Sequence, residues 1–240
     1  EVRHVFGCGM RPEDVDSLAQ AELNIVVHDE LGLAAAEYLE ERCGMPYIAP
    51  LPPYGRAGTR RWLEEICAVL PPPQMAAAMA EIHAAERRDF LRINDLKNTW
   101  GELCFDTVLI RAPRTTAWGM AQALRTEWAD VRHLAVAAVL RADEAGAAIA
   151  DERLAETDTA RAQELLAAME HGLLMGSSSE SVYADPRRML YLPVAYPVVD
   201  RLLLSDLPFM GLRGARCMED ALWNGSVLRR ELSVRAWKNQ

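Results

Sequence analysis

Short runs of apolar residues alternate along the chain with longer segments in which apolar positions recur every three or four residues. Apolar runs without alternation predict strands buried on both faces of a sheet, and the longer segments predict amphipathic helices. The predicted strands are residues 1–6, 23–27, 45–49, 105–110, 132–140, 172–176 and 190–195. No hairpin signal such as Asn-Gly joins two of these runs, which favours parallel strands connected by right-handed helical crossovers.

Helices are predicted between the strands, and several have recognisable ends. Pro12 lies in the first turn of the segment that begins at Arg11, and Gly44 suits the carboxyl-terminal cap of the following helix. Thr59 suits an amino-terminal cap. The predicted helices are residues 11–19, 29–43, 59–70, 74–97, 117–128, 159–170, 180–184 and 215–237. The polar, Ala-rich segment 141–158 carries no clear prediction.

Three consecutive prolines, Pro71 to Pro73, form the clearest break in the sequence, because proline cannot continue a helix interior. We therefore predict an α/β protein with two Rossmann-like units, whose parallel sheets are flanked by helices. The expected ranges are 1–73 for an incomplete first unit, 74–98 for a connecting helix and 99–240 for the second unit. If both sets of strands formed one continuous sheet, this division would be refuted.

The composition of the 240-residue chain limits the classes of function. Half of the residues are hydrophobic, which is enough for a sizeable core. The formal net charge of −9 repels phosphates and anionic lipids, so we expect neither nucleic acid nor a membrane as a partner. Because neither a run of 18 apolar residues nor a signal peptide is visible, we expect a cytoplasmic location.

The cysteines do not form a disulfide or zinc-binding pattern. Their number is odd, their spacings are wide and no C-x-x-C pair occurs, which agrees with a reducing compartment. The five residues are Cys8, Cys43, Cys67, Cys104 and Cys217. We expect the last four to behave as small buried hydrophobic residues, as most free cysteines do.

Ligands of open parallel sheets bind beyond the carboxyl ends of the strands. This rule selects six loops, at residues 7–10, 28–30, 50–58, 111–116, 176–179 and 196–201. Two facing units would place these loops around a shared cleft. We therefore expect His28 and Arg114, which follow strands of different units, to face the same cleft.

Two candidate metal ligands lie on the loops of the first unit. Cys8 stands between two glycines, where the thiol can bind a metal or cluster, although an ordinary tight turn explains the pattern as well. His28 directly follows a strand and precedes Asp29, which could orient the imidazole for metal binding or proton transfer. The alternative is a histidine at a helix start that is hydrogen-bonded to Asp29 or Glu30.

The second unit offers candidate anion sites at two helix starts. Arg111 and Arg114 flank a proline turn, where guanidinium groups favour a phosphate or carboxylate; salt bridges to nearby acids are the alternative. Ser177 and Ser178 can hold an anion or cofactor, or simply cap a helix. The sequence has no G-x-G-x-x-G after a strand, no P-loop and no G-x-S-x-G elbow, which argues against classical NAD binding, P-loop ATPases and α/β-hydrolases.

Several segments, taken in order, resemble one protein family. The first is the predicted strand 23–27, which is followed by E-E-R-C-G-M-P-Y-I at residues 40–48. The second unit adds L-L-M-G-S-S-S-E at residues 173–180. It also contains Y-P-V-V-D-R at residues 196–201, which resembles the family's F-P-x-x-D-R stretch. The segments are residues 23–27, 40–48, 53–55, 59–63, 173–180, 196–201 and 208–215. Over nearly its whole length, the chain is similar to the nitrogenase component 1 type oxidoreductases, which include nitrogenase MoFe-type subunits, cofactor-assembly scaffolds and protochlorophyllide-reductase-like subunits.

The resemblance implies three Rossmann-like domains in the family, of which this chain matches the middle and C-terminal ones. It implies two partners, a homologous component 1 subunit in a homo- or hetero-oligomer and an ATP-dependent iron–sulfur reductase. It also implies an iron–sulfur cluster or metallocluster in the full-length complex. Because the matched part lacks the region with most of the cluster cysteines, we expect no cluster on this fragment alone.

The family's site residues are only partly present. His28 stands where catalytic nitrogenase subunits have a cofactor-binding cysteine, and no histidine occurs in 196–199, where the second cofactor ligand is expected. The turn Arg111-Ala112-Pro113-Arg114 resembles the family's arginine-rich turn near the cofactor, with alanine in place of one arginine. The resemblance therefore does not favour dinitrogen reduction on this chain.

The leading hypothesis is an oxidoreductase subunit, a nitrogenase-like component 1 fragment that lines a substrate or cofactor cleft in a two-component reductase. In this hypothesis His28 binds a metal or transfers a proton, and Arg111 and Arg114 bind anionic groups. A metallocluster assembly scaffold without turnover and a non-enzymatic small-molecule binding module are the alternatives.

Overall fold

The computed structural model describes residues 2–6, 10–69, 73–139, 148–202 and 208–238. The chain forms two compact units, Glu1–Leu51 and Pro52–Gln240. Within the described residues, the strands form two separate sheets, one of two strands and one of five, and every strand pair is parallel. The predicted fold class, α/β with parallel sheets flanked by helices, is confirmed.

The first unit contains a 3-10 helix, two short strands and one α-helix. These elements are η1 (Pro12–Gln20), β1 (Asn24–Ile25), α1 (Asp29–Cys43) and β2 (Tyr47–Ile48). The two strands pair in the register Asn24 to Tyr47. Gly44 ends α1 with φ of 68°, a left-handed conformation that glycine adopts without steric cost, as the sequence predicts.

The predicted strand at the beginning of the chain is wrong. Residues 2–6 form no strand, and Val2, Val5 and Phe6 are exposed. A strand needs a neighbour for its backbone hydrogen bonds and a surface for its apolar side chains. Neither is provided for these residues, so their apolar character alone does not make them a strand.

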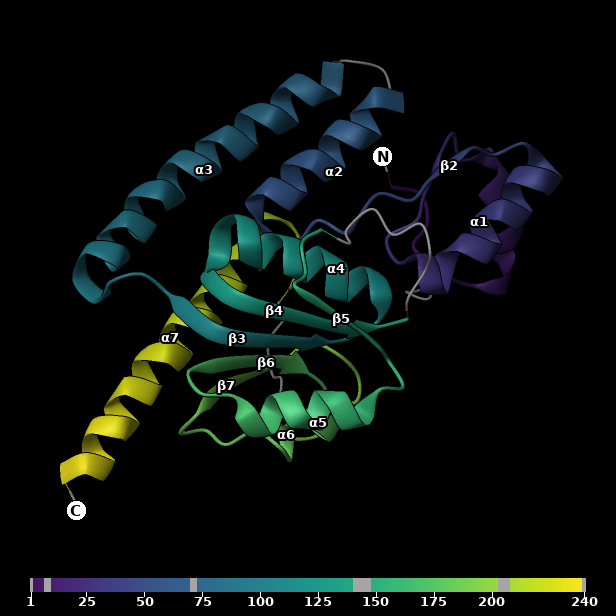
Figure 1. The fold of residues 1–240 in the computed structure, drawn as a ribbon. Coiled ribbons are helices and arrows are strands. Elements are labelled where there is room, and N and C mark those ends of the chain that lie inside the picture. Colours follow the sequence, from purple (N-terminus) through teal and green to yellow (C-terminus); the bar gives the residue numbers. More distant parts are fainter. Residues whose placement is uncertain (1, 7–9, 70–72, 140–147, 203–207, 239–240) are drawn as a thin grey trace. The chain divides into compact units, whose positions relative to one another are not determined.

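The second unit is built on a five-stranded sheet in the order β5-β4-β3-β6-β7 (Figure 1). The strands are β3 (Cys104–Arg111), β4 (Asp130–Ala138), β5 (Glu152–Ala155), β6 (Gly172–Gly176) and β7 (Met189–Pro193). The chain proceeds from β3 outward to β5 and then returns to the other side of β3 at β6. This order is that of a doubly wound Rossmann-type sheet, and its topological switch point lies between β3 and β6.

Helices cover both faces of this sheet. On one face lies α4 (Arg114–Ala123), which continues into a π-helical turn, η2 (Leu124–Trp128), and α5 (Thr159–Ala168) lies on the other (Figure 1). Leu109 and Leu174 of the central strands pack with Leu166 of α5 in a fully buried cluster. Burial of each such side chain stabilises the folded state by about 2 kcal/mol. Because the central strands are buried in this way, their sequences are continuous apolar runs, and these runs predict the strand positions well.

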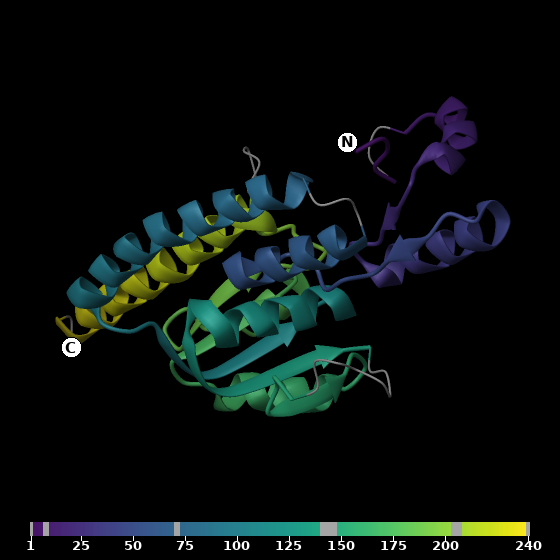
Figure 2. The same ribbon diagram turned by 90° about the horizontal axis from the view of Figure 1, so that it is seen from above.

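Four further helices belong to the described part of the second unit. They are α2 (Gly55–Val69), α3 (Pro73–Trp100), the short α6 (Ser178–Ser181), which follows β6, and α7 (Gly211–Lys238). Helix α2 packs against α3, α4 and α7. Residues 89–96 of α3 lie opposite residues 216–223 of α7, where Arg216 binds Asp89; in Figure 2 the two helices point in similar directions.

The compact units divide the chain at a different point from the expected ranges 1–73, 74–98 and 99–240. Helix α2 was expected to belong to the first unit, whereas its contacts are with helices of the second. Thr59 also does not cap the helix: α2 begins at Gly55, and the Thr59 hydroxyl donates to the Gly55 carbonyl oxygen at 2.6 Å. A threonine hydroxyl inside a helix often donates to the carbonyl oxygen four residues earlier, and it is then not available to cap the helix.

Strand β5 lies in the segment for which the sequence carried no prediction. It is an edge strand that pairs only with β4, in the register Ala135 to Glu152. Edge strands bury less surface and carry charged residues, so their apolar signal is weak. Within the described residues, no helix has the length and apolar character needed to cross a bilayer.

Candidate functional site

The loops at the carboxyl ends of β3 and β6 flank the topological switch point of the five-stranded sheet. Arg111 ends β3 and Arg114 begins α4, while Ser177 and Ser178 follow β6. Ligands of doubly wound sheets bind in the crevice at this point. Four of the residues selected from the sequence therefore lie where the fold favours a ligand.

Arg111 connects the carboxyl ends of two strands. Its Nη2 donates to the Glu156 carbonyl oxygen at 3.0 Å, and its Nε lies 3.6 Å from Oε1 of Glu180. The side chain is 23 % exposed. Arg111 thus forms the salt bridge that the alternative predicted, with Glu180, although the contact is long. A guanidinium has five N–H donors, and this side chain remains accessible to an anion from solvent.

Arg114 is the first residue of α4 and is half-buried. The amide groups of the first helical turn add a partial positive charge to that of the guanidinium, which favours an anion here. The turn is anchored on its inner side, where Thr115 and Thr116 are buried and the Tyr54 hydroxyl donates to Oγ1 of Thr116 at 3.4 Å.

Ser177 caps α6. Its Oγ accepts from the Ser179 amide at 3.2 Å, and Oε2 of Glu180 accepts from the Ser177 amide at 2.7 Å and from the hydroxyl at 2.6 Å. This reciprocal pair is a capping box. Glu180 therefore stabilises the helix start and also lies beside Arg111, which links the two loops.

Ser178 links α6 to the loop that follows β7. Its Oγ donates to Oδ1 of Asp200 at 2.7 Å and accepts from the Val199 amide at 2.8 Å, and its amide donates to the Pro197 carbonyl oxygen at 2.8 Å. The Ser178 hydrogen bond is the main cause of the lowered pKa of Asp200. Ser178 is buried, so it holds the loop in place. No local sequence pattern indicates this Ser178–Asp200 pair, because the partners are 22 residues apart.

An apolar pocket of about 280 Å³ lies beyond the carboxyl end of β7. It is lined by the end of β7, the loop after it and the beginning of α7, including Leu192, Val194, Phe209 and Met218. Arg201 and Cys217 also line it. The apolar lining, with one cation and few polar groups, is typical of a small-molecule site.

The cysteine prediction is wrong for two of the four residues that it covered. Cys43 and Cys104 are exposed, whereas Cys67 and Cys217 are partly buried, and none of these four forms a disulfide. Cys43 ends α1 and Cys104 begins β3, and element ends are less well packed than element centres. Cys217 is the one that lines the apolar pocket.

His28 and Cys8, the candidate metal ligands, lie in the first unit. His28 is partly buried, and this burial lowers the pKa of its imidazole while the nearby Glu30 carboxylate opposes the shift. The imidazole is therefore mainly neutral near pH 7, the state that binds metals. Cys8 lies outside the described residues, and the convergence of His28 with Arg114 stays a prediction.

Among the residues that the structure describes, no three His, Cys, Asp or Glu side chains converge as metal ligands. The family resemblance implies a metallocluster in the full-length complex. The described side chains alone do not fit such a group, and we assign no chemical step to a cluster on them.

A buried group of charges in the second unit was missed at the sequence level. Arg56 of α2 lies among Asp89, Glu127 and Glu219, which come from three different helices. These residues are far apart in the sequence, and the charge pattern of each helix is that of an ordinary exposed face. Only their convergence in the tertiary structure reveals the group.

The doubly wound sheet defines a Rossmann-type α/β fold, and in proteins of this fold ligands bind at the carboxyl edge of the parallel sheet. Among such proteins, this chain belongs to the nitrogenase component 1 type oxidoreductases, because the sequence pattern of that family matches residues 1–225.

Named relatives agree with this assignment. A subunit of the light-independent protochlorophyllide reductase of Nostoc punctiforme is 27 % identical over 233 residues, which are 93 % of this chain and 45 % of the relative. The corresponding subunit of Gloeobacter violaceus is 24 % identical over 250 residues, or 96 % of this chain and 47 % of the relative. The chain thus spans about half the length of the curated relatives it matches.

A solved structure described as "Nitrogenase Cp1 at pH 6.5" has a similar fold. It matches with a TM-score of 0.72 and 14 % identity, over 89 % of this chain and 47 % of that chain. At this identity the match supports the fold alone.

Proposed function

We propose that the chain is the middle and C-terminal part of a nitrogenase-like component 1 subunit in a two-component, iron–sulfur-dependent reductase. The observation that carries this proposal is the position of Arg111 and Arg114 at the topological switch point of the sheet. An apolar pocket lies at the carboxyl edge of the same sheet, beyond β7. Arg201 is the cation that lines this pocket, and a cation beside apolar surface suits an organic substrate or cofactor that carries an anionic group.

The proposed roles follow from the state of each side chain. Arg111 and Arg114 bind anionic groups, since both lie at the switch point and Arg111 is partly exposed. His28 binds a metal or takes part in proton transfer, and its lowered pKa favours the neutral form that accepts a proton. Cys8 is proposed as a metal ligand on the sequence pattern alone.

For Ser177 and Ser178 we propose a positioning role in cofactor binding. Both hydroxyls are engaged in hydrogen bonds to Glu180, Asp200 and nearby amides. They therefore influence a bound cofactor by holding the loops after β6 and β7 in place. Substitution of either residue should alter ligand affinity through the geometry of these loops.

The partners in this proposal are a homologous component 1 subunit and an ATP-dependent iron–sulfur reductase that supplies electrons. The named relatives are subunits of protochlorophyllide reductase. Protochlorophyllide, a large apolar ring system with a carboxylate, is accordingly the first substrate to test. The apolar pocket would suit the ring system, and Arg201, which lines it, would suit the carboxylate.

Anaerobic purification of the full-length protein with its partner subunit tests the proposal. We expect iron and acid-labile sulfide in the complex, and substrate reduction that requires the ATP-dependent reductase. Iron and sulfide without turnover would favour the assembly scaffold. The absence of both metal and turnover would favour the non-enzymatic binding module.

Substitution of Arg114 by alanine in that complex tests the site itself. We expect a loss of tenfold or more in kcat/KM, because a hydrogen bond to a charged group contributes about 1.5–3 kcal/mol. Arg132→Ala is the matched control, since Arg132 is 82 % exposed and pairs with Asp106 near the amino ends of the strands. Equal effects of the two substitutions would contradict a site at the carboxyl edge.

A further inference from the structure

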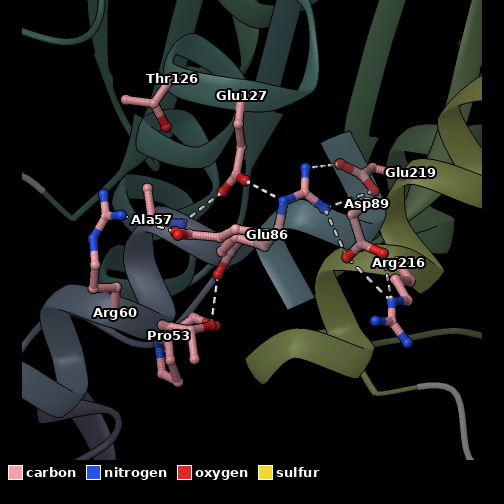
Figure 3. Close-up of polar contacts among 12 residues, drawn as sticks. Pro53, Ala57, Arg60, Glu86, Asp89, Thr126, Glu127, Arg216 and Glu219 are labelled. Carbon is pink, nitrogen blue, oxygen red and sulfur yellow. Dashed lines mark hydrogen bonds and ion pairs between the residues drawn. The ribbon is translucent and has the colours of Figure 1, made fainter. Parts of the chain in front are cut away.

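A buried charge cluster joins four helical segments of the second unit. We define it as Arg56 of α2, Asp89 of α3, Glu127 of η2, and Arg216 and Glu219 of α7. The exposed fractions of the side chains are 9 % for Arg56, 7 % for Asp89, 12 % for Glu127 and 13 % for Glu219, while Arg216 is 38 % exposed. The three carboxylates converge from different elements (Figure 3).

The Arg56 guanidinium contacts all three carboxylates, but unequally. Both of its terminal nitrogens bind Glu219, with Nη1 donating to Oε2 at 2.9 Å and Nη2 to Oε1. Its Nη1 lies 3.7 Å from Oδ2 of Asp89, and its Nε lies 3.4 Å from Oε2 of Glu127. Glu219 therefore has the bidentate pair, and Glu127 has a single, longer contact.

Asp89 has a second cation. The Nε of Arg216 donates to both of its carboxylate oxygens at 3.2 Å. Glu127 instead accepts at Oε1 from a neutral group, the Ala57 amide, at 3.3 Å. Within the cluster, Glu127 is thus the carboxylate with the weakest ionic pairing.

The cluster has one carboxylate more than it has guanidinium groups. Three carboxylates face two arginines, so full ionisation leaves one negative charge that is mostly removed from water. An uncompensated buried charge is costly, and carboxylates that share a cation disfavour the ionised state of one another. Binding of one proton makes the cluster neutral.

The weak ionic pairing of Glu127 makes it the carboxyl best suited to hold this proton. Burial raises its pKa from 4.5 to about 7, and the neighbouring Glu219 charge adds to the rise, whereas Arg56 and the Ala57 and Arg56 amides oppose it. The neighbouring Arg60–Glu86 pair, at 2.8 Å, is more exposed and already balanced in charge. The geometry and the pKa shift therefore select the same residue.

The Glu127 carboxyl, which belongs to η2, also packs against the backbone of the first turn of α2. Gly55 has φ of 71°, and a Cβ built there would lie 1.8 Å from Oε1 of Glu127. Glu127 itself lies on the π-helical turn η2, a local irregularity of the kind that is frequent at functional positions. The Glu127 carboxyl is thus in direct contact with the beginning of α2.

We infer that the cluster is a proton-sensitive latch, in which protonated Glu127 holds the first turn of α2 against η2 and α7, and loss of the proton loosens that turn. Glu219 is flanked on α7 by Met218, which lines the apolar pocket beyond β7. The latch therefore acts on the helix that forms one wall of that pocket. This inference does not depend on the proposed reductase activity.

The sign of the pH effect follows from the direction of the shift. The folded state binds the Glu127 proton more tightly than the unfolded state, so folding is most favoured at low pH within this range. The stabilisation decreases as the pH rises from about 4.5 to about 7 and is lost above the folded pKa. One proton corresponds to a change of at most about tenfold per pH unit in the opening equilibrium.

Amide hydrogen exchange of the first turn of α2, measured from pH 5 to pH 8.5 and corrected for intrinsic exchange, tests the inference. For the wild-type chain we expect the opening constant to increase up to pH 7 and then to level off. Glu127→Gln keeps the acceptor for the Ala57 amide but cannot ionise, so its profile should be flat. Glu86→Gln, the control on α3, should retain the wild-type profile.

A wild-type profile without the increase, or a Glu127→Gln profile that retains it, would overturn the inference. If Glu127→Gln does not fold, carboxyl carbon NMR of the wild-type chain decides the question. We expect one glutamate carboxyl to titrate near pH 7. Titration of every glutamate below pH 6 would overturn the latch.

Discussion

Arg56 and Arg111 show what a guanidinium does in two different regions of the same unit. Arg56 is almost completely enclosed by helices, and carboxylates surround it. Arg111 lies at the open carboxyl edge of the sheet, where its partners among the described residues include the Glu156 carbonyl oxygen and the Glu180 carboxylate at 3.6 Å. The first arginine is committed to the protein, whereas the second retains donors that a ligand can use.

The difference comes from the surroundings rather than from the residue type. Within a layer of packed helices, a cation is tolerated only if carboxylates replace the water that it loses. At the end of a parallel strand, the backbone turns toward solvent and leaves a crevice. Substitutions should therefore affect folding in the first region and ligand binding in the second.

Arg56→Ala should have the largest effect on folding. Removal of the guanidinium leaves the carboxylates of Asp89, Glu127 and Glu219 buried with Arg216 as the remaining cation. We expect a loss of about 3–5 kcal/mol in the free energy of unfolding, measured with urea, because the broken pair leaves uncompensated buried charge. Arg132→Ala, at an exposed pair, should cost less than about 1 kcal/mol.

Gly55→Ala should destabilise the chain by a smaller amount, about 2 kcal/mol or somewhat more. The left-handed backbone alone costs about 1–2 kcal/mol for alanine, and the new Cβ displaces Glu127. Gly211→Ala is the matched control, since Gly211 has φ of 73° and no atom within 4 Å of the added Cβ. The difference between the two thermal midpoints reports the contacts of the added Cβ with Glu127 and Ala123, and equal midpoints would contradict them.

Ser178→Ala should cost about 1–2 kcal/mol, because it removes two hydrogen bonds of the buried Ser178 hydroxyl, one to the Asp200 carboxylate and one from the Val199 amide. The loop after β7 should become more accessible to proteases, while α6 keeps the Ser177 cap. Ser179→Ala is a useful control, since the Ser179 amide, and not its side chain, takes part in the cap. Similar proteolysis of both variants would show that Ser178 does not hold the loop.

Arg111→Ala should have the smallest effect on folding, less than about 1 kcal/mol, because its ion pair is partly exposed and long. In the reductase complex the same change should raise KM or lower kcat. A large loss of stability with unchanged kinetics would show that Arg111, like Arg56, serves the fold and not ligand binding. Both readouts come from the same purified complex, so they can be compared directly.

Much of the fold is readable in the sequence, and much of the site is not. The central strands β3 and β6 were predicted to within a residue or two, because buried parallel strands are continuous apolar runs. The loops after them were selected by the same rule. The Ser178–Asp200 bond and the Arg56 cluster were not predicted, since both join residues that are distant along the chain.

The order of apolar and polar residues by itself determined the α/β class, the parallel direction of the strands and the family, because local periodicity and turn residues carry these features. The tertiary structure alone decided which arginine is enclosed, which serines cap or hold a loop, and where a carboxyl binds its proton near neutral pH. These properties depend on burial and on distances between side chains from different helices. Such distances are set only when the helices pack.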